Sequence, residues 1–376
     1  MRAPARSRRG ITLIEVVIAT LVSLILTAAA VAFATQETRL LDLSQERLEA
    51  NMVGRSALAL LADDLRKAGA GVGYDEQGRF LGLVADNFTA GGLAFNGTGS
   101  AIAEGDNSVA PVGVSAQNTF TRPRAGTFSG QTYTVPTHDL GIRFANGSYA
   151  TIIRERGYSG TLCSSPDISY ENNEWVVLRD SSGISALSGT IQVGAPTTGA
   201  GCRCVGGCSA FTFTPTPTMM MSGQGANRVT YGYGEVQGGL QTVVWFVVAN
   251  ATGEGELRRV TFDDPNDNCA ARQTCGGLVA DFAEAMYTQI WRWNSVTNQW
   301  TQAGQGANPA TEERMRVDVE LILRSENETR SLRPEVQAKL RANACVPAPC
   351  GSPDKYTRLA YRTSVEIMNS GVMRMR

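Results

Sequence analysis

The chain has 376 residues, of which 18% are charged, with a formal net charge of -1 and 40 glycines. This balance lacks the basic excess of a general nucleic-acid-binding protein, and the sparse charge with abundant glycine argues against a helical bundle. The roughly 300 residues after the N-terminal segment are enough for one large domain, which we expect to be rich in β-structure.

The N-terminal segment carries the strongest pattern in the sequence. A basic leader ends at Gly10 and is followed by an apolar run, residues 11–34, whose only charged residue is Glu15. A run of this length exceeds the about 20 residues that a membrane-spanning helix needs. Four arginines precede the run, which predicts that the N-terminus stays in the cytoplasm and the remainder crosses the membrane. A cleaved secretory signal is the alternative, although the run is long for one and contains an acid.

Residues 8–16, RRGITLIEV, resemble the class III leader of type IV pilins, a family that includes minor pilins and the related pseudopilins. The resemblance implies that a prepilin peptidase cuts after Gly10 and that the new N-terminal residue, Ile11, is N-methylated. Cutting there would leave 366 residues and change the net charge from -1 to -5, because the leader holds four arginines. Ile11 departs from the family pattern, in which phenylalanine is commoner.

Glu15 matches the glutamate of that family. By resemblance, its carboxylate neutralises the N-terminal amine of a neighbouring subunit as the helices assemble into a fibre. The physics agrees, because a carboxylate and an ammonium group that are buried separately each carry a large desolvation cost, which a pair offsets. Glu15 is therefore the predicted assembly residue.

A helical pattern continues beyond the apolar run. Its apolar positions share one broad face and need a covering sheet: Leu41, Leu48, Met52, Leu58, Leu61 and Leu65. Asp63 and Lys67 are spaced for an i,i+4 ion pair. Gly69 and the glycines after it predict the end of one helix spanning 11–68. Residues 64–69, DLRKAG, resemble the end of this helix in PilW-type minor pilins.

The remainder of the chain predicts strands. The sequence from 82 to 147 favours loops and short strands, and 278–290 a short helix or a bent strand. The other expected elements are strands at 149–155, 175–179, 228–233, 240–248 and 257–262, and a short helix at 334–340. Apolar residues alternate with charged ones in 315–323 and again in 359–367, so we expect these two strands in one antiparallel sheet against the helix.

All eight cysteines follow residue 150, and their even number predicts disulfides in an oxidising compartment. Cys269 with Cys275, and Cys345 with Cys350, are spaced to close short loops. The remaining four are Cys163, Cys202, Cys204 and Cys208, whose connectivity stays open, with Cys163 pairing one of the cluster as the preferred arrangement. Zinc at 202–208 is the disfavoured alternative because the spacing is not that of paired C-x-x-C ligands.

Three further patterns bear on catalysis or ligand binding. His138, the only histidine, is expected in a surface loop and has no recognised catalytic partners. Residues 263–268 begin like a calcium loop, but Cys269 and Cys275 replace the glycine and the acid that such a loop requires, which favours a disulfide-closed turn over calcium. Three tryptophans at 291, 293 and 300 flank a polar loop, which predicts a hairpin with its aromatics on one side. A stacking platform for single-stranded DNA, or a carbohydrate or adhesin surface, stays open there.

Together these patterns predict an α+β, pilin-like fold, with a long N-terminal helix packed on an antiparallel sheet domain that has long, disulfide-containing loops. The expected parts are a cleaved leader (1–10), a membrane or fibre-core helix (11–34), its amphipathic continuation (35–69) and a β-rich domain (70–376). The expected function is a non-enzymatic minor pilin without cofactor or metal. The alternatives are a type II secretion pseudopilin and a signal-anchored periplasmic or surface enzyme.

The resemblance also implies where the protein works and with what. Its partners would be other minor pilins, the major pilin, the prepilin peptidase and the inner-membrane assembly platform, with a tip adhesin as a further candidate. The subunit would first lie in the inner membrane with its globular domain in the periplasm, and then in a surface pilus serving motility, adhesion or DNA uptake.

Overall fold

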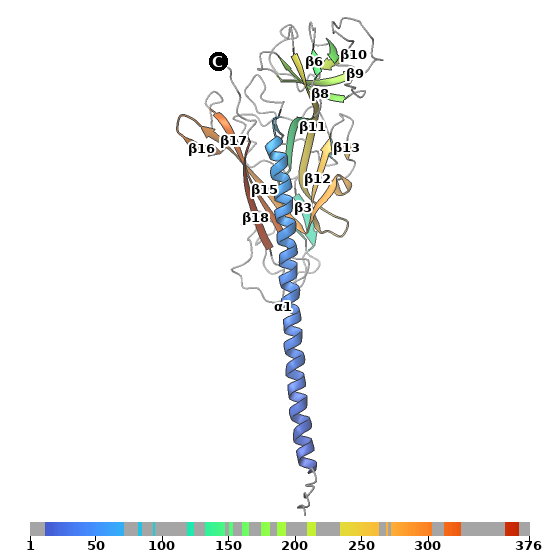
Figure 1. Ribbon diagram of the computed structural model, residues 1–376, viewed down its shortest axis with the longest axis vertical. Coiled ribbons are helices and arrows are strands. Elements are labelled where there is room, and N and C mark those ends of the chain that lie inside the picture. The colour runs from blue at the N-terminus through green and yellow to red at the C-terminus, as the bar shows by residue number, and fades with distance from the viewer. Residues whose placement is uncertain are drawn as a thin grey trace, which may run out of the picture. The chain divides into compact units, whose positions relative to one another are not determined.

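A computed structural model describes residues 12–70, 82–84, 93–94, 119–123, 132–146, 150–152, 160–164, 174–180, 186–192, 209–215, 234–262, 268–269, 272–302, 312–324 and 358–367. The chain divides into two compact units, residues 1–51 and residues 52–376. One long helix and several antiparallel sheets make up the described part, which is an α+β architecture (Figure 1).

Helix α1 (Leu13–Lys67) is the blue coil of Figure 1. It ends where the glycine pattern predicts, because Gly69 adopts the left-handed conformation (φ 74°) that stops a helix and donates its N–H to the Arg143 carbonyl at 2.8 Å. Two i,i+3 pairs are present in place of the expected i,i+4 pair between Asp63 and Lys67. Asp63 pairs with Arg66, and Lys67 Nζ lies 4.0 Å from an Asp64 oxygen.

The larger sheet has ten strands, and the longest, β11 (Gly234–Ala249), pairs with four of them. Every pairing in it is antiparallel. The other strands are β1 (Leu83–Val84), β5 (Leu140–Asn146), β6 (Ala150–Ile152), β7 (Gly160–Ser164), β8 (Glu174–Asp180), β9 (Ala186–Gln192), β10 (Ser209–Pro215), β12 (Gly255–Phe262) and β14 (Gly277–Asp281). The strands expected at 149–155, 175–179, 240–248 and 257–262 are confirmed as β6, β8, β11 and β12.

A second antiparallel sheet has the order β16-β15-β17-β18. Its strands are β15 (Ala283–Asn294), β16 (Gln299–Gln302), β17 (Glu312–Arg324) and β18 (Arg358–Ile367). The alternating segments 315–323 and 359–367 are confirmed as the paired strands β17 and β18. The segment 278–290, expected as a short helix or a bent strand, is not helical. It belongs to two strands, β14 and β15, separated at Phe282, whose φ is 57°.

Three small elements complete the described part. Strands β2 (Leu93–Ala94) and β13 (Asn268–Cys269) form one pair, and β3 (Thr119–Pro123) and β4 (Thr132–Pro136) form another. A 3-10 turn, η4, covers Arg272–Thr274. Within 82–147 the described elements are short strands, as expected, whereas 228–233 and 334–340 lie outside the described residues.

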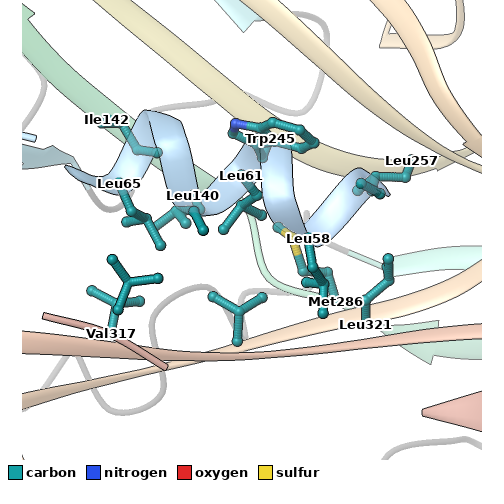
Figure 2. Packing of buried hydrophobic residues seen from close by; sticks show 14 of the residues in the cluster. Leu58, Leu61, Leu65, Leu140, Ile142, Trp245, Leu257, Met286, Val317 and Leu321 are labelled. Carbon is teal, nitrogen blue, oxygen red and sulfur yellow. The ribbon is translucent and has the colours of Figure 1, made fainter. Parts of the chain in front are cut away.

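The last turns of α1 lie between the two sheets (Figure 2). Leu58, Leu61 and Leu65 are buried there, with Trp245 of the larger sheet on one side and Val317 of the smaller sheet on the other. These leucines recur every three or four residues, so they share the helix face that the sheets cover. The predicted packing of the helix against β17 and β18 is therefore confirmed.

Buried polar contacts also fix α1 in this position. Asp64, which is 1% exposed, accepts a hydrogen bond from the Trp245 indole N–H at 3.0 Å. It also receives two from the Arg259 guanidinium, at 2.7 and 3.1 Å. Because β11 and β12 supply these two partners, the carboxylate ties the helix to the centre of the larger sheet.

Two sequence interpretations are wrong. The apolar stripe expected to lie under a sheet is covered only in part, because Met52 is 70% exposed while Leu58 is 8% exposed. His138 is not on a surface loop. It is 1% exposed, and its Nδ1 accepts a hydrogen bond from the Thr288 N–H at 2.9 Å, because the segment between β4 and β5 packs against β15.

Candidate functional site

The N-terminal half of α1 presents apolar side chains to its surroundings. Its large hydrophobic residues from Leu13 to Phe33 are between 47% and 85% exposed. Within the described part of the chain, α1 is the helix long and apolar enough to cross a membrane. Water does not solvate such a surface favourably, so it requires a lipid or protein environment.

Glu15 and Thr12 form a capping box at the start of this helix. The Glu15 carboxylate accepts hydrogen bonds from the Thr12 backbone N–H at 2.9 Å and from its hydroxyl at 3.0 Å. The carbonyl of Thr12 in turn accepts hydrogen bonds from the N–H groups of Glu15 and Val16. The carboxylate thereby satisfies one helix donor, the Thr12 N–H, which is the glutamate half of a capping box, whereas the Thr12 hydroxyl donates to Glu15 instead of accepting its N–H. Glu15 thus stabilises the start of the helix, while its negative charge stays in an apolar segment.

Threonine side chains within and next to the apolar segment bond to their own helix. The hydroxyls of Thr20, Thr27 and Thr35 donate to backbone carbonyls three or four residues earlier, at 2.7 to 2.9 Å. Such internal bonds remove the cost of placing a hydroxyl in an apolar medium. Glu15 is therefore the residue in the segment whose charge still calls for a partner.

Thr12 is the functional residue that the sequence interpretation overlooked. The pattern Thr-x-x-Glu ahead of an apolar run is a recognisable capping-box signal, and it is present at residues 12–15. Gly10 and Ile11, the predicted processing and methylation residues, lie outside the described residues.

The described residues include few of the cysteines predicted to form disulfides. Cys275 is 2% exposed and is disulfide-bonded. Cys163 lies in β7 and Cys269 in β13, whereas Cys202, Cys204, Cys208, Cys345 and Cys350 lie outside the described residues. All the pairings proposed from spacing therefore stay predictions, as does the disulfide-closed turn favoured over calcium at 263–268, where only residue 268 is described. Among the described residues no cluster of His, Cys, Asp and Glu could hold a metal ion.

The predicted tryptophan hairpin is confirmed. Strands β15 and β16 pair with Trp293 opposite Trp300, and the two rings meet edge to face at 5.4 Å. The structure adds two cations that lie far from this hairpin in sequence. The guanidinium groups of Arg314 and Arg316, on β17, lie 4.9 Å from the ring centres of Trp293 and Trp300 respectively.

His138 and Asp139 have structural roles. Its Nδ1 accepts the Thr288 N–H, and its ring meets Tyr287 edge to face at 5.5 Å. Asp139 binds Arg272 through two hydrogen bonds of 2.7 Å. Burial raises the pKa of Asp139, and the Arg272 guanidinium opposes that shift. Both contacts attach the segment between β4 and β5 to its neighbours.

Comparison with solved structures gives a distant likeness. No family model and no curated protein matches this chain. Among solved structures, a type IV-like pilin from Thermus thermophilus has a TM-score of 0.21 and 12% sequence identity, over 54% of this chain and 87% of that one.

Proposed function

We propose that this chain is a non-enzymatic minor pilin, a subunit that primes or caps a type IV pilus. The observation that carries the proposal is Glu15, the single charged residue in the apolar run 11–34, where the large side chains of α1 are exposed. A membrane anchor alone needs no acid at this depth, and an acid there is costly unless it meets a cation. The leader pattern at residues 8–16 supplies that cation, since cutting after Gly10 would create an amine at Ile11.

The capping box suggests how Glu15 changes partners. In the single subunit the Glu15 carboxylate accepts two hydrogen bonds from Thr12, the residue next to the proposed new N-terminus, Ile11. The N-methylated amine of an adjacent subunit would offer a full positive charge in place of two neutral donors. Both arrangements use the ionised carboxylate, but only the amine adds an opposite charge, and attraction between opposite charges is strong in an apolar medium, so the exchange favours the assembled state.

The location and partners of the subunit follow from the same proposal. Before assembly the N-terminus would be cytoplasmic, residues 11–34 would cross the inner membrane and the β-rich part would lie in the periplasm. After assembly the subunit would join other minor pilins and the major pilin at the cell surface, with the prepilin peptidase and the assembly platform as earlier partners and a tip adhesin as a further candidate.

Mass spectrometry of the mature N-terminus tests the proposal directly. The protein would be taken from sheared surface fibres and from membranes of the same cells. An N-methylated Ile11 in the fibre fraction is the expected result. A chain that still begins at Met1, or one cut near Ala32, and absent from fibres, would contradict it and would favour a signal-anchored enzyme.

Substitutions separate the two roles of the N-terminal segment. Gly10→Glu should block cutting, whereas Glu15→Ala should leave cutting intact and abolish incorporation into fibres. Glu37→Ala is the matched control, because Glu37 is an exposed acid on the same helix beyond the apolar run. Incorporation of the Glu15→Ala protein at the wild-type level would refute the pairing of Glu15 with an amine.

A deletion strain distinguishes the pilus from a secretion pseudopilus. Both systems share the leader pattern and the glutamate, so the N-terminus cannot separate them. Loss of fibres and motility supports the minor pilin, whereas loss of exoprotein release with normal fibres supports the pseudopilin.

A further inference from the structure

Five side chains on the smaller sheet form a continuous stack, here called the Trp-Arg ladder. Its members are Trp291, Trp293, Trp300, Arg314 and Arg316. Arg314 lies 4.9 Å from Trp293 and 6.0 Å from Trp300, and Arg316 lies 4.9 Å from Trp300 and 5.3 Å from Trp291. Each guanidinium therefore contacts two indole rings, which holds the stack rigid.

The ladder occupies the face of the sheet that points away from α1. Trp291 pairs across the strands with Arg316, whereas the adjacent pair, Ile290 and Val317, is buried in the core beside α1. Successive side chains of a strand point to opposite faces. The ladder side is accordingly open, with the Arg314 side chain 50% exposed. At the end of the same hairpin, Val296 is 75% exposed.

Stacking of nucleic-acid bases does not suit this surface. Bases stack on free aromatic faces beside uncompensated positive charge. Here the guanidinium groups already lie over the indoles, and each has a carboxylate close by. Arg314 lies 3.4 Å from Glu366, and Arg316 lies 3.1 Å from Asp318.

The composition is instead that of a protein interface. Tryptophan and arginine are the residues most enriched at the energetic centres of such interfaces. Side chains that are already locked by stacking lose little conformational entropy when a partner covers them. A polar rim of charged residues on β17 and β18 surrounds the ladder, as interfaces commonly have.

Charge balance on this face points to the identity of the partner. Next to the two arginine–carboxylate pairs of the ladder, Arg362 binds Glu320 at 2.7 Å, and its side chain is 76% exposed. The face thus carries three arginines and three carboxylates, so a two-fold related copy can place its carboxylates over these arginines and its arginines over these carboxylates. We propose that the Trp-Arg ladder face binds the same face of a second copy of this chain.

The size of the face predicts a weak, reversible dimer. One end of this face is closed, because Tyr287 and Ile322 are buried there. Four strands spaced by about 4.8 Å, each open over about six residues at about 3.3 Å per residue, present about 400 Å². Two such faces would bury about 800 Å² in total, which is the size of a weak, transient contact.

Photo-crosslinking in native membranes tests the proposal on the full-length chain. A photo-activatable amino acid would replace Ser364, which is exposed on this face, and Thr261, which is exposed on β12, would be the control position. We expect the Ser364 variant to give a product of two chains whose linked peptides both come from residues 283–367. No product, a product with another protein or nucleic acid, or equal yield from the control position would overturn the proposal.

Charge reversal tests whether this face drives the association. Arg362→Glu would place like charges across the interface and should lower the crosslink yield by more than about tenfold. Arg66→Glu, an exposed arginine on α1, should leave the yield unchanged. The double variant Arg362→Glu with Glu320→Arg restores the charge balance and should restore the yield, which separates interface loss from misfolding. An unchanged yield for Arg362→Glu, or no recovery in the double variant, would overturn the proposal.

Discussion

Asp64 is the residue whose removal should most weaken the attachment of α1 to the larger sheet. Its carboxylate is 1% exposed and accepts three hydrogen bonds from two side chains, Trp245 and Arg259. Asp64→Ala would leave a buried indole N–H without an acceptor and a guanidinium without its counter-charge. Both consequences oppose folding, because the buried indole N–H cannot reach water and the partly exposed guanidinium regains only part of its hydration.

The size of the effect follows from the burial of each partner. Breaking a fully buried ion pair by removing one partner costs about 3–5 kcal/mol, and an unsatisfied buried donor costs about 1–3 kcal/mol. Arg259 is 28% exposed at its side chain, so water recovers part of its charge. We therefore expect Asp64→Ala to lower the free energy of unfolding by about 3 kcal/mol, and Asp64→Asn to lower it by less, because an amide oxygen can still accept the indole N–H.

Denaturant unfolding of the detergent-solubilised chain, followed by pulse proteolysis, would measure these differences. At about 2–4 °C per kcal/mol for a domain of this size, Asp64→Ala should also lower the midpoint temperature by about 6–12 °C. Asp63→Ala is the matched control. Its carboxylate is 63% exposed and pairs with an exposed Arg66, so its removal should cost less than about 1 kcal/mol. Equal destabilisation by the two alanine variants would refute the role assigned to Asp64.

Three further predictions concern the globular part. Gly54→Ala should lower the free energy of unfolding by about 1–3 kcal/mol, because its new Cβ would lie 2.6 Å from a ring carbon of Tyr361. Glu284→Gln should lower it by about 3 kcal/mol, because the fully buried Glu284 carboxylate binds Arg358 through two nitrogens. Arg143→Met should raise it by about 1 kcal/mol at pH 7, since burial lowers the pKa of Arg143 to about 10 and disfavours its charge, and this cost exceeds the value of its 3.3 Å hydrogen bond to the Thr242 hydroxyl. A basic group whose folded pKa is lowered destabilises the fold while charged, so the wild type should gain stability as the pH rises through 10, and Arg143→Met should not.

The same unfolding measurement provides the control for each prediction. Gly54→Ala should cost little when Tyr361 is replaced by alanine, and two independent, additive effects would contradict the close approach. Glu320→Gln disturbs an ion pair with the exposed Arg362 and should cost less than about 1 kcal/mol; a loss as large as that of Glu284→Gln would contradict the importance of burial. Destabilisation by Arg143→Met would show that the hydrogen bond to Thr242 outweighs the cost of burying the guanidinium.

Local patterns in the sequence determined the secondary structure well where the signals are short-range. The end of α1 at Gly69 depends on the conformation of that one residue, and the strands at 315–323 and 359–367 depend on alternation within a few neighbours. The capping box of Thr12 and Glu15 is likewise local, since the two residues are three apart. Hydrogen-bond geometry and side-chain period act over one or two turns, so a sequence records them directly.

Contacts between distant segments were decided only by the tertiary structure. One apolar stripe of α1 contains both the exposed Met52 and the buried Leu61, and nothing near either residue distinguishes them. The partners of Asp64 lie 181 and 195 residues away, and the arginines of the Trp-Arg ladder come from a different strand than its tryptophans. The burial of His138 likewise depends on distant segments and could not be predicted from its neighbours in the sequence. Burial and ion pairing depend on which strands the fold places together, and that pairing is set by the sum of many long-range contacts.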